Sequence, residues 1–73
     1  MRKAEVNGKR LGQNIAEHRR NKGLTQEALA RCAGCARTTI VRLEQGNSQP
    51  SVEMLFRIAA ALDCRASELV KGI

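Results

Sequence analysis

The sequence predicts an all-α fold, with five short helices in a single compact domain. Apolar residues recur at three- and four-residue spacing along most of the chain, and no stretch alternates apolar and polar residues as a half-buried strand would. Glycines follow the first three apolar runs, at positions typical of helix ends. With 73 residues, 42% of them hydrophobic, the chain can bury one small core and no more.

The first third of the chain is polar and basic. Residues 1–8 are predicted to form a flexible basic arm, and residues 9–73 are predicted to form the domain. The first helix is expected over residues 9–22, where apolar residues follow one helical stripe. Gly23 should end this helix, because glycine enters the left-handed backbone region without a Cβ penalty.

Residues 24–46 predict two short helices joined by a tight turn at Gly34. Thr25 suits the N-cap of the first of these, since its hydroxyl can accept a hydrogen bond from a free backbone N–H. After the turn, Ile40 and Leu43 form an apolar pair one helical turn apart and should face the core. A helix-turn-helix of this spacing can hold its second helix in the major groove of DNA.

The last third predicts two more helices. Pro50 interrupts the chain, because the residue before a proline is driven towards extended geometry. Ser51 is a suitable N-cap for a strongly amphipathic helix over residues 52–62. After a turn, a short final helix is expected over residues 66–70.

The charge of the chain favours an anionic partner, either nucleic acid or a membrane surface, because the net charge is +6. Residues 1–23 hold seven Lys or Arg against two Glu, whereas residues 48–73 hold three basic and three acidic residues. No apolar run approaches the roughly 20 residues of a membrane span, and no apolar segment follows the charged N-terminus as in a signal peptide. We therefore expect a cytoplasmic protein.

Several sequence words occur together in a familiar order: LTQEALA, AGCARTTIVRLEQG, QPSVEML, RIAAALDC and ASEL. Over residues 11–70 they resemble the lambda-repressor/Cro-type (XRE-like) helix-turn-helix regulators of bacteria and phages. The resemblance implies a compact five-helix lambda-repressor-like domain, with the helix-turn-helix formed by helices 2 and 3. It further implies a sequence-specific double-stranded DNA-binding transcriptional regulator, expected to be a homodimeric repressor of a palindromic operator.

Three outward positions of the predicted third helix match the family's base-reading positions: Arg37, Thr38 and Arg42. An arginine there can donate two hydrogen bonds to guanine O6 and N7. The alternative is that both arginines contact phosphates alone, since half or more of protein–DNA hydrogen bonds go to the backbone.

Phosphate contacts are expected from four further residues. By resemblance, Gln26 binds a phosphate and braces the reading helix, while Gln45 and Asn47 contact the DNA backbone from the following loop. Arg10 is a fourth candidate because it belongs to the basic N-terminal region, although a merely solvated basic end fits equally well.

Arg19 and Glu44 match a semi-buried ion pair that joins the first and third helices of the family. The sequence also departs from the family pattern. Ala36 stands where a Ser or Thr usually caps the reading helix, and Arg65 stands where Ser often caps the last helix. Val41 occupies a position where polar residues are common. Because of Ala36 and Val41, the DNA contacts of this helix can differ from those usual in the family.

The three cysteines invite a metal or redox interpretation. Cys32 and Cys35 form a CxxC motif, and Cys64 and His18 could complete four zinc ligands. Core packing is the favoured alternative, because free cysteine behaves as a small hydrophobic residue. An odd number of cysteines also argues against a disulfide framework. We therefore expect no metal and no cofactor, with Cys32 the thiol most exposed to oxidation.

No catalytic constellation is apparent in the sequence, so an enzyme is not expected.

The apolar residues near the C-terminus exceed what one core layer needs, and three of them are candidates for a dimer interface: Met54, Phe56 and Ile73. Packing within one chain is the alternative for each. A small-molecule ligand is not expected, and the regulator could belong to the phage repressors, the restriction–modification controllers or the antitoxin-type regulators.

Overall fold

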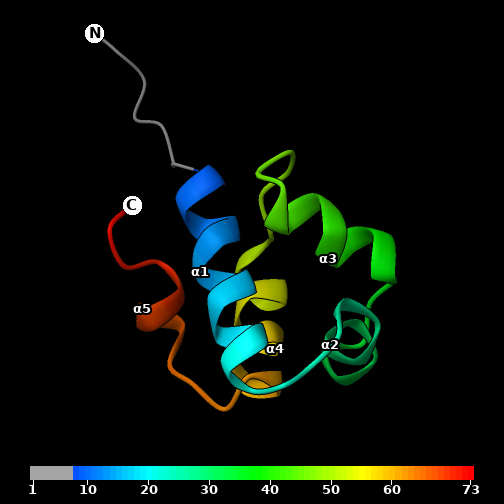
Figure 1. Cartoon of the computed structure of the whole chain (residues 1–73). Helices are drawn as coiled ribbons and strands as arrows, with labels where there is room; N and C mark the ends of the chain where they lie inside the picture. The colour runs from blue at the N-terminus through cyan, green and yellow to red at the C-terminus, as the bar shows by residue number, and fades with distance from the viewer. Residues whose placement is uncertain (1–7) are drawn as a thin grey trace, which may run out of the picture.

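The computed structural model describes residues 8–73 and confirms the all-α prediction, with five helices and no strand in that range (Figure 1). The helices are α1 (Gly8–Asn21), α2 (Gln26–Ala33), α3 (Arg37–Glu44), α4 (Val52–Ala61) and α5 (Ala66–Leu69). Apart from Gly8, which begins α1, the predicted basic arm lies outside the described residues.

Helix ends agree with the sequence prediction to within one residue. α1 ends at Asn21, one residue earlier than predicted. The hydrogen bonds that follow span three residues instead of four: the N–H of Gly23 donates to the carbonyl oxygen of Arg20 at 2.9 Å. The hydroxyl of Thr25 accepts from the N–H of Ala28 at 3.0 Å and caps α2. The hydroxyl of Ser51 caps α4 in the same way.

The turn between α2 and α3 is made by Gly34, whose φ of 74° lies in the left-handed region. Its N–H reaches back to the carbonyls of Ala30 and Arg31, which satisfies two groups at the end of α2. The predicted helix-turn-helix is therefore present, with α2 and α3 in contact (Figure 1).

The core is shared by all five helices. α3 packs against α1 and α2, while α5 packs against α1 and α4, and α4 also contacts α2. The largest fully buried side chains come from every helix: Ile15, Leu29, Ile40, Leu43, Ile58 and Leu69. No helix within residues 8–73 is long and apolar enough to cross a membrane.

The backbone of α1 meets the end of α3 directly at Gly12. A Cβ on Gly12 would collide with the carbonyl oxygen of Leu43 and lie 2.7 Å from that of Glu44. No real Cβ tolerates such proximity to backbone atoms. Gly12 therefore permits the close crossing that sets α3 against α1, a contact that the apolar pattern alone did not indicate.

A buried asparagine fastens the C-terminal segment to α1. Asn14 is 8% exposed, and its Nδ2 donates to the carbonyl oxygens of Leu69 and Lys71, both at 2.8 Å. Both N–H groups of the amide are thereby used. The sequence signal for this contact is a polar residue inside the apolar stripe of α1, beside Ile15.

Substituting Gly12 by Ala should destabilise the fold by about 1–3 kcal/mol, because α3 must move away from α1 to admit the methyl group. Urea unfolding measures this change. Gln13→Ala is the matched control: Gln13 is exposed on the same helix, and its replacement should alter stability by less than about 0.5 kcal/mol. Equal stability of the two variants would contradict the close crossing.

Candidate nucleic-acid interface

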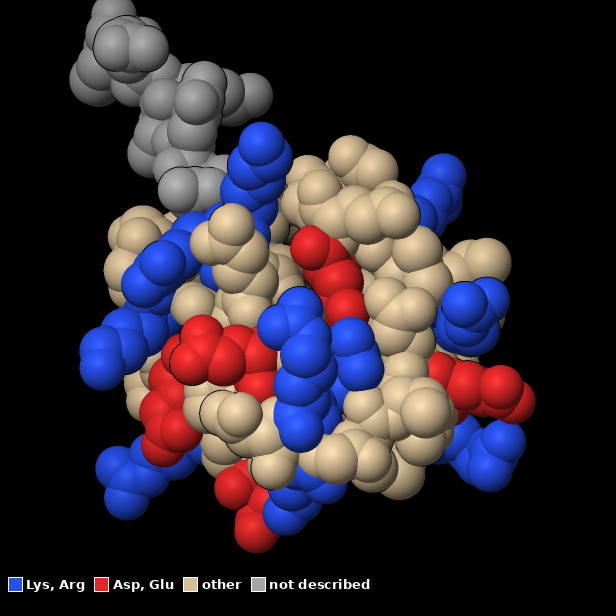
Figure 2. Space-filling model, in the orientation of Figure 1, with Lys and Arg blue, Asp and Glu red and all other residues tan. Residues whose placement is uncertain are grey.

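The outward face of α3 carries the three residues predicted to read bases. Arg37, Thr38 and Arg42 are all exposed, whereas Ile40 and Leu43 on the opposite side are at most 2% exposed. The helical repeat separates these two sets without ambiguity. Figure 2 shows Lys and Arg side chains projecting from the edge of the molecule where α3 lies in Figure 1.

The start of α3 lacks a side-chain cap. Ala36 has the extended backbone of an N-cap residue, yet no side chain bonds the free N–H groups of the first turn. Val41, the other unusual residue on this helix, is half-buried. The first turn of α3 therefore keeps backbone donors that are available to solvent or to an anion.

The other end of α3 is held by a buried ion pair between the two residues that the resemblance pairs. Arg19 Nε donates to Glu44 Oε2 at 2.7 Å, and Arg19 Nη2 donates to Oε1 at 3.2 Å. The side chains are 14% and 7% exposed, respectively. The same guanidinium donates to the carbonyl of Leu24 at 2.8 Å, so α1, the loop before α2, and α3 meet at one group.

Gln26 joins this network from the first position of α2. Its Nε2 donates to Glu44 Oε1 at 3.0 Å. An amide nitrogen has two N–H groups, and the bond to Glu44 uses one of them. Gln26 therefore braces α3 and keeps a second N–H that could meet a phosphate.

The two polar residues after α3 lie on the surface and bond to each other. Asn47 Nδ2 donates to Gln45 Oε1 at 3.1 Å, and both residues are exposed. The bond leaves the amide nitrogen of Gln45 able to donate elsewhere. The loop thus presents a donor beside the end of the candidate reading helix.

The structure places Arg10 apart from these groups. Its Nε lies 3.0 Å from the position that a Cβ on Gly72 would take, so the side chain lies against the C-terminal segment. It lines a groove with residues of α1 and α5 rather than with α3. A phosphate contact by Arg10 would require the side chain to leave Gly72.

The cysteines do not gather as the four-ligand zinc alternative would require. Cys32 is exposed, while Cys35 and Cys64 are partly buried against the core, and all three are free thiols. Burial raises the pKa of the Cys35 thiol, although Arg57 opposes the shift. Burial also raises the pKa of Cys64, with further contributions from the carboxylates of Glu68 and Asp63.

An apolar surface remains on α4 and the C-terminal segment. Val52 and Phe56, one helical turn apart, are 72% and 61% exposed, and Ile73 is also exposed. Leu55 and Ile73 take part in lining an adjoining hollow. Of the three predicted interface residues, Phe56 and Ile73 are exposed, whereas Met54 is half-buried and packs against the core.

Replacing Glu44 by Ala should lower the free energy of unfolding by about 3 kcal/mol, because it leaves Arg19 charged, largely buried and without its carboxylate. Thermal or urea unfolding measures the loss. The control is Glu27→Ala, which breaks the exposed Glu27–Arg31 pair and should cost no more than about 1 kcal/mol. Similar losses of unfolding free energy in the two variants would show that the buried pair contributes no more to stability than the exposed pair does.

Comparison with known proteins agrees with this geometry. The family model described as helix-turn-helix matches residues 15–69. A helix-turn-helix-type transcriptional regulator of Methanothermobacter thermautotrophicus is 52% identical over 48 residues, which are 66% of this chain and 70% of that protein.

Two solved structures share the fold over most of this chain. The restriction–modification controller protein C.AhdI from Aeromonas hydrophila has a TM-score of 0.85 at 34% identity, covering 89% of this chain and 98% of that one. The P22 c2 repressor in complex with a synthetic operator has a TM-score of 0.80 at 28% identity, covering 86% and 96%. The chain therefore belongs to the lambda-repressor/Cro-type helix-turn-helix family, whose members are DNA-binding transcriptional regulators rather than enzymes.

Proposed function

We propose that this protein is a sequence-specific regulator that binds a palindromic operator as a homodimer and represses transcription. The observation that carries the proposal is the division of α3 into two faces. Ile40 and Leu43 bury one face in the core, and the other face presents two arginines and a threonine to solvent. Such a helix can enter the major groove without disturbing the fold.

Base reading is assigned to the outward residues of α3. Arg37 and Arg42 can each donate two hydrogen bonds to a guanine, and Thr38 can contact a neighbouring base or a thymine methyl. Arg37 stands in the first turn and Arg42 more than one turn later, so together they span several base pairs along the groove.

Phosphate contacts would fix the register of α3 on the duplex. Gln26 contributes the N–H that Glu44 does not use, and Gln45 with Asn47 contributes donors from the next loop. Arg10 joins them if it leaves the C-terminal segment. The basic arm of residues 1–8 would add salt-dependent affinity for DNA.

Dimerisation is assigned to the apolar surface that includes Phe56 and Ile73. Two copies related by a two-fold axis would present their α3 helices to half-sites about 34 Å apart, which is one turn of DNA. Occupation of the operator would block transcription by occlusion. The protein would act in the cytoplasm of a prokaryotic cell, where the DNA is.

The operator can be obtained by selecting bound sites from random duplex DNA, and enrichment of a palindrome is the expected result. On the selected duplex, Arg37→Ala and Arg42→Ala should each weaken binding by about 5- to 150-fold, the equivalent of 1–3 kcal/mol for a bidentate base contact. Mobility-shift titration measures the loss, and a scrambled duplex should show a much smaller change.

Arg65→Ala provides the matched control, since Arg65 is an exposed arginine at the start of α5. Its loss removes the same charge outside the helix-turn-helix, so binding should fall only slightly. If Arg37→Ala and Arg42→Ala weakened the selected and scrambled duplexes equally, the two arginines would be phosphate contacts and the base-reading proposal would fail.

Phe56→Glu should convert the dimer to a monomer, because it places a charge in the apolar surface. Sedimentation equilibrium measures the change, and site selection with this variant should enrich half-sites in place of palindromes. Gln13→Glu adds the same charge to an exposed position of α1 and should leave the oligomeric state unchanged. A wild-type protein that stays monomeric on its palindrome would contradict the proposal.

A further inference from the structure

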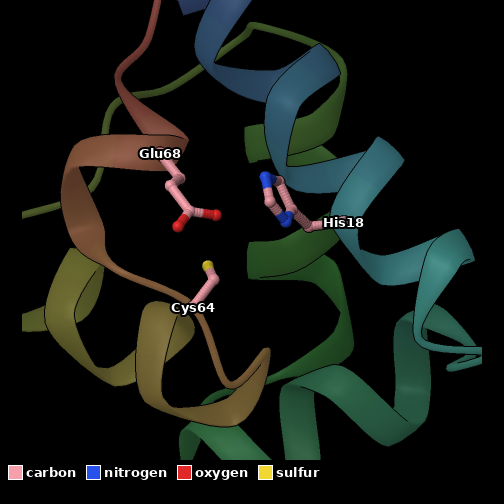
Figure 3. Close-up of side chains that lie close together, drawn as sticks. All are labelled: His18, Cys64 and Glu68. Atoms are coloured by element: carbon pink, nitrogen blue, oxygen red, sulfur yellow. The ribbon is translucent and has the colours of Figure 1, made fainter.

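Three side chains from separate parts of the sequence converge between α1 and α5 (Figure 3). His18 comes from α1, Cys64 from the turn after α4, and Glu68 from α5. One imidazole nitrogen, the Cys64 Sγ and one carboxylate oxygen all lie within 4.8 Å of one another. In Figure 3 the three side chains point into the same space.

The donor set is one that zinc uses in proteins: an imidazole nitrogen, a thiolate sulfur and a carboxylate oxygen. Zinc bonds of about 2.0–2.3 Å place tetrahedral ligands roughly 3.3–3.8 Å apart. The three donors, which lie within 4.8 Å of one another, therefore need to approach by at most about 1.5 Å to reach that geometry. Glu68 is exposed, and His18 is only half-buried, so both side chains have room to rotate inward.

Across residues 8–73, no hydrogen bond or ion pair engages the imidazole of His18, the thiol of Cys64 or the carboxylate of Glu68. By contrast, four other carboxylates in this range each pair with a basic side chain. Figure 2 shows acidic side chains gathered over the part of the molecule where α5 lies.

Solvent reaches the cluster along a groove. The groove is lined by His18 and Glu68 together with four other residues: Arg10, Asn14, Glu17 and Lys71. It supplies a path for the ion and a water molecule for a fourth coordination position. The two basic side chains in the groove weaken the attraction for a cation, and the two carboxylates strengthen it.

We propose that His18, Cys64 and Glu68 bind one zinc ion, with water as the fourth ligand. The ion joins α1 to the C-terminal segment, close to the Asn14 hydrogen bonds. Its three ligands lie outside α3, so the metal stabilises the attachment of α5 rather than contacting DNA. The site does not include Cys32 or Cys35, the two cysteines of the CxxC motif.

Cobalt(II) titration of the metal-free protein tests this site, because a cobalt–thiolate bond gives a charge-transfer absorption in the near ultraviolet. The band should saturate at one equivalent and disappear when zinc is added. Cys64→Ser should abolish it. Glu68→Gln and His18→Gln each remove a proposed ligand and should weaken cobalt binding by more than about 10-fold. Mutation of an outer-shell partner typically weakens metal binding by about 10- to 100-fold, so loss of a ligand should cost at least as much.

Matched controls separate this site from the other thiols and carboxylates. Cys32→Ser, Cys35→Ser and Glu53→Gln, the last on α4 outside the groove, should bind cobalt as the wild type does. Persistence of the band in Cys64→Ser, with its loss in Cys32→Ser or Cys35→Ser, would assign the metal to the CxxC motif and overturn the proposal. Absence of a thiolate band in the wild type would also overturn it.

Thermal unfolding provides a second readout. Excess zinc should raise the unfolding midpoint of the wild type and of Cys32→Ser by at least about 4 °C, and it should not raise that of Glu68→Gln. Because Glu68 is exposed, this variant should fold even if Cys64→Ser does not, and circular dichroism verifies its helix content. An equal zinc-induced rise in Glu68→Gln and in the wild type would contradict coordination by Glu68.

Discussion

The carboxylate of Glu44 is the group on which the position of α3 depends. It is almost fully buried at the end of the helix, and a buried charge is costly unless it is paired and hydrogen-bonded. Arg19 supplies a two-point ion pair from α1, and Gln26 supplies an amide donor from α2. All three helices must therefore be in register for the carboxylate to be satisfied. The crossing at Gly12 brings the same end of α3 against the backbone of α1.

This arrangement gives a single eight-residue helix one face fixed in the core and one face exposed to solvent. The inner side of α3 is fixed by Ile40, Leu43 and the bonds to Glu44, while the outer side carries long, exposed side chains that do not contribute to the core. A helix this short is unstable by itself in water, so tertiary contacts must hold it. The outward residues can consequently vary in sequence with little cost to the fold, as the proposed base-reading role requires.

The C-terminal segment depends on fewer contacts. α5 has four residues, and Asn14 holds its end to α1 through two backbone carbonyls. Leu69 adds one fully buried side chain. Leu55 of α4 and the cluster of His18, Cys64 and Glu68 adjoin this segment from different elements. Both a partner subunit and a metal ion would add contacts where the single chain has least, which is a common need of domains this small.

Local sequence determined the helices, their caps and the inward and outward faces of α3, because each follows from residues close together in the chain. Thr25 and Ser51 form two caps, and Gly34 forms the turn. Ile40 and Leu43 form the buried face of α3. The Arg19–Glu44 pair was accessible through family resemblance alone. Tertiary structure decided which groups meet across helices. It set the carbonyl partners of Asn14, the close approach at Gly12, the partly buried position of Met54 and the convergence of Glu68 with His18 and Cys64. Each of these depends on residues that are far apart in the chain. Periodicity assigns a side chain to a face of its helix, but packing selects its neighbour on the next one.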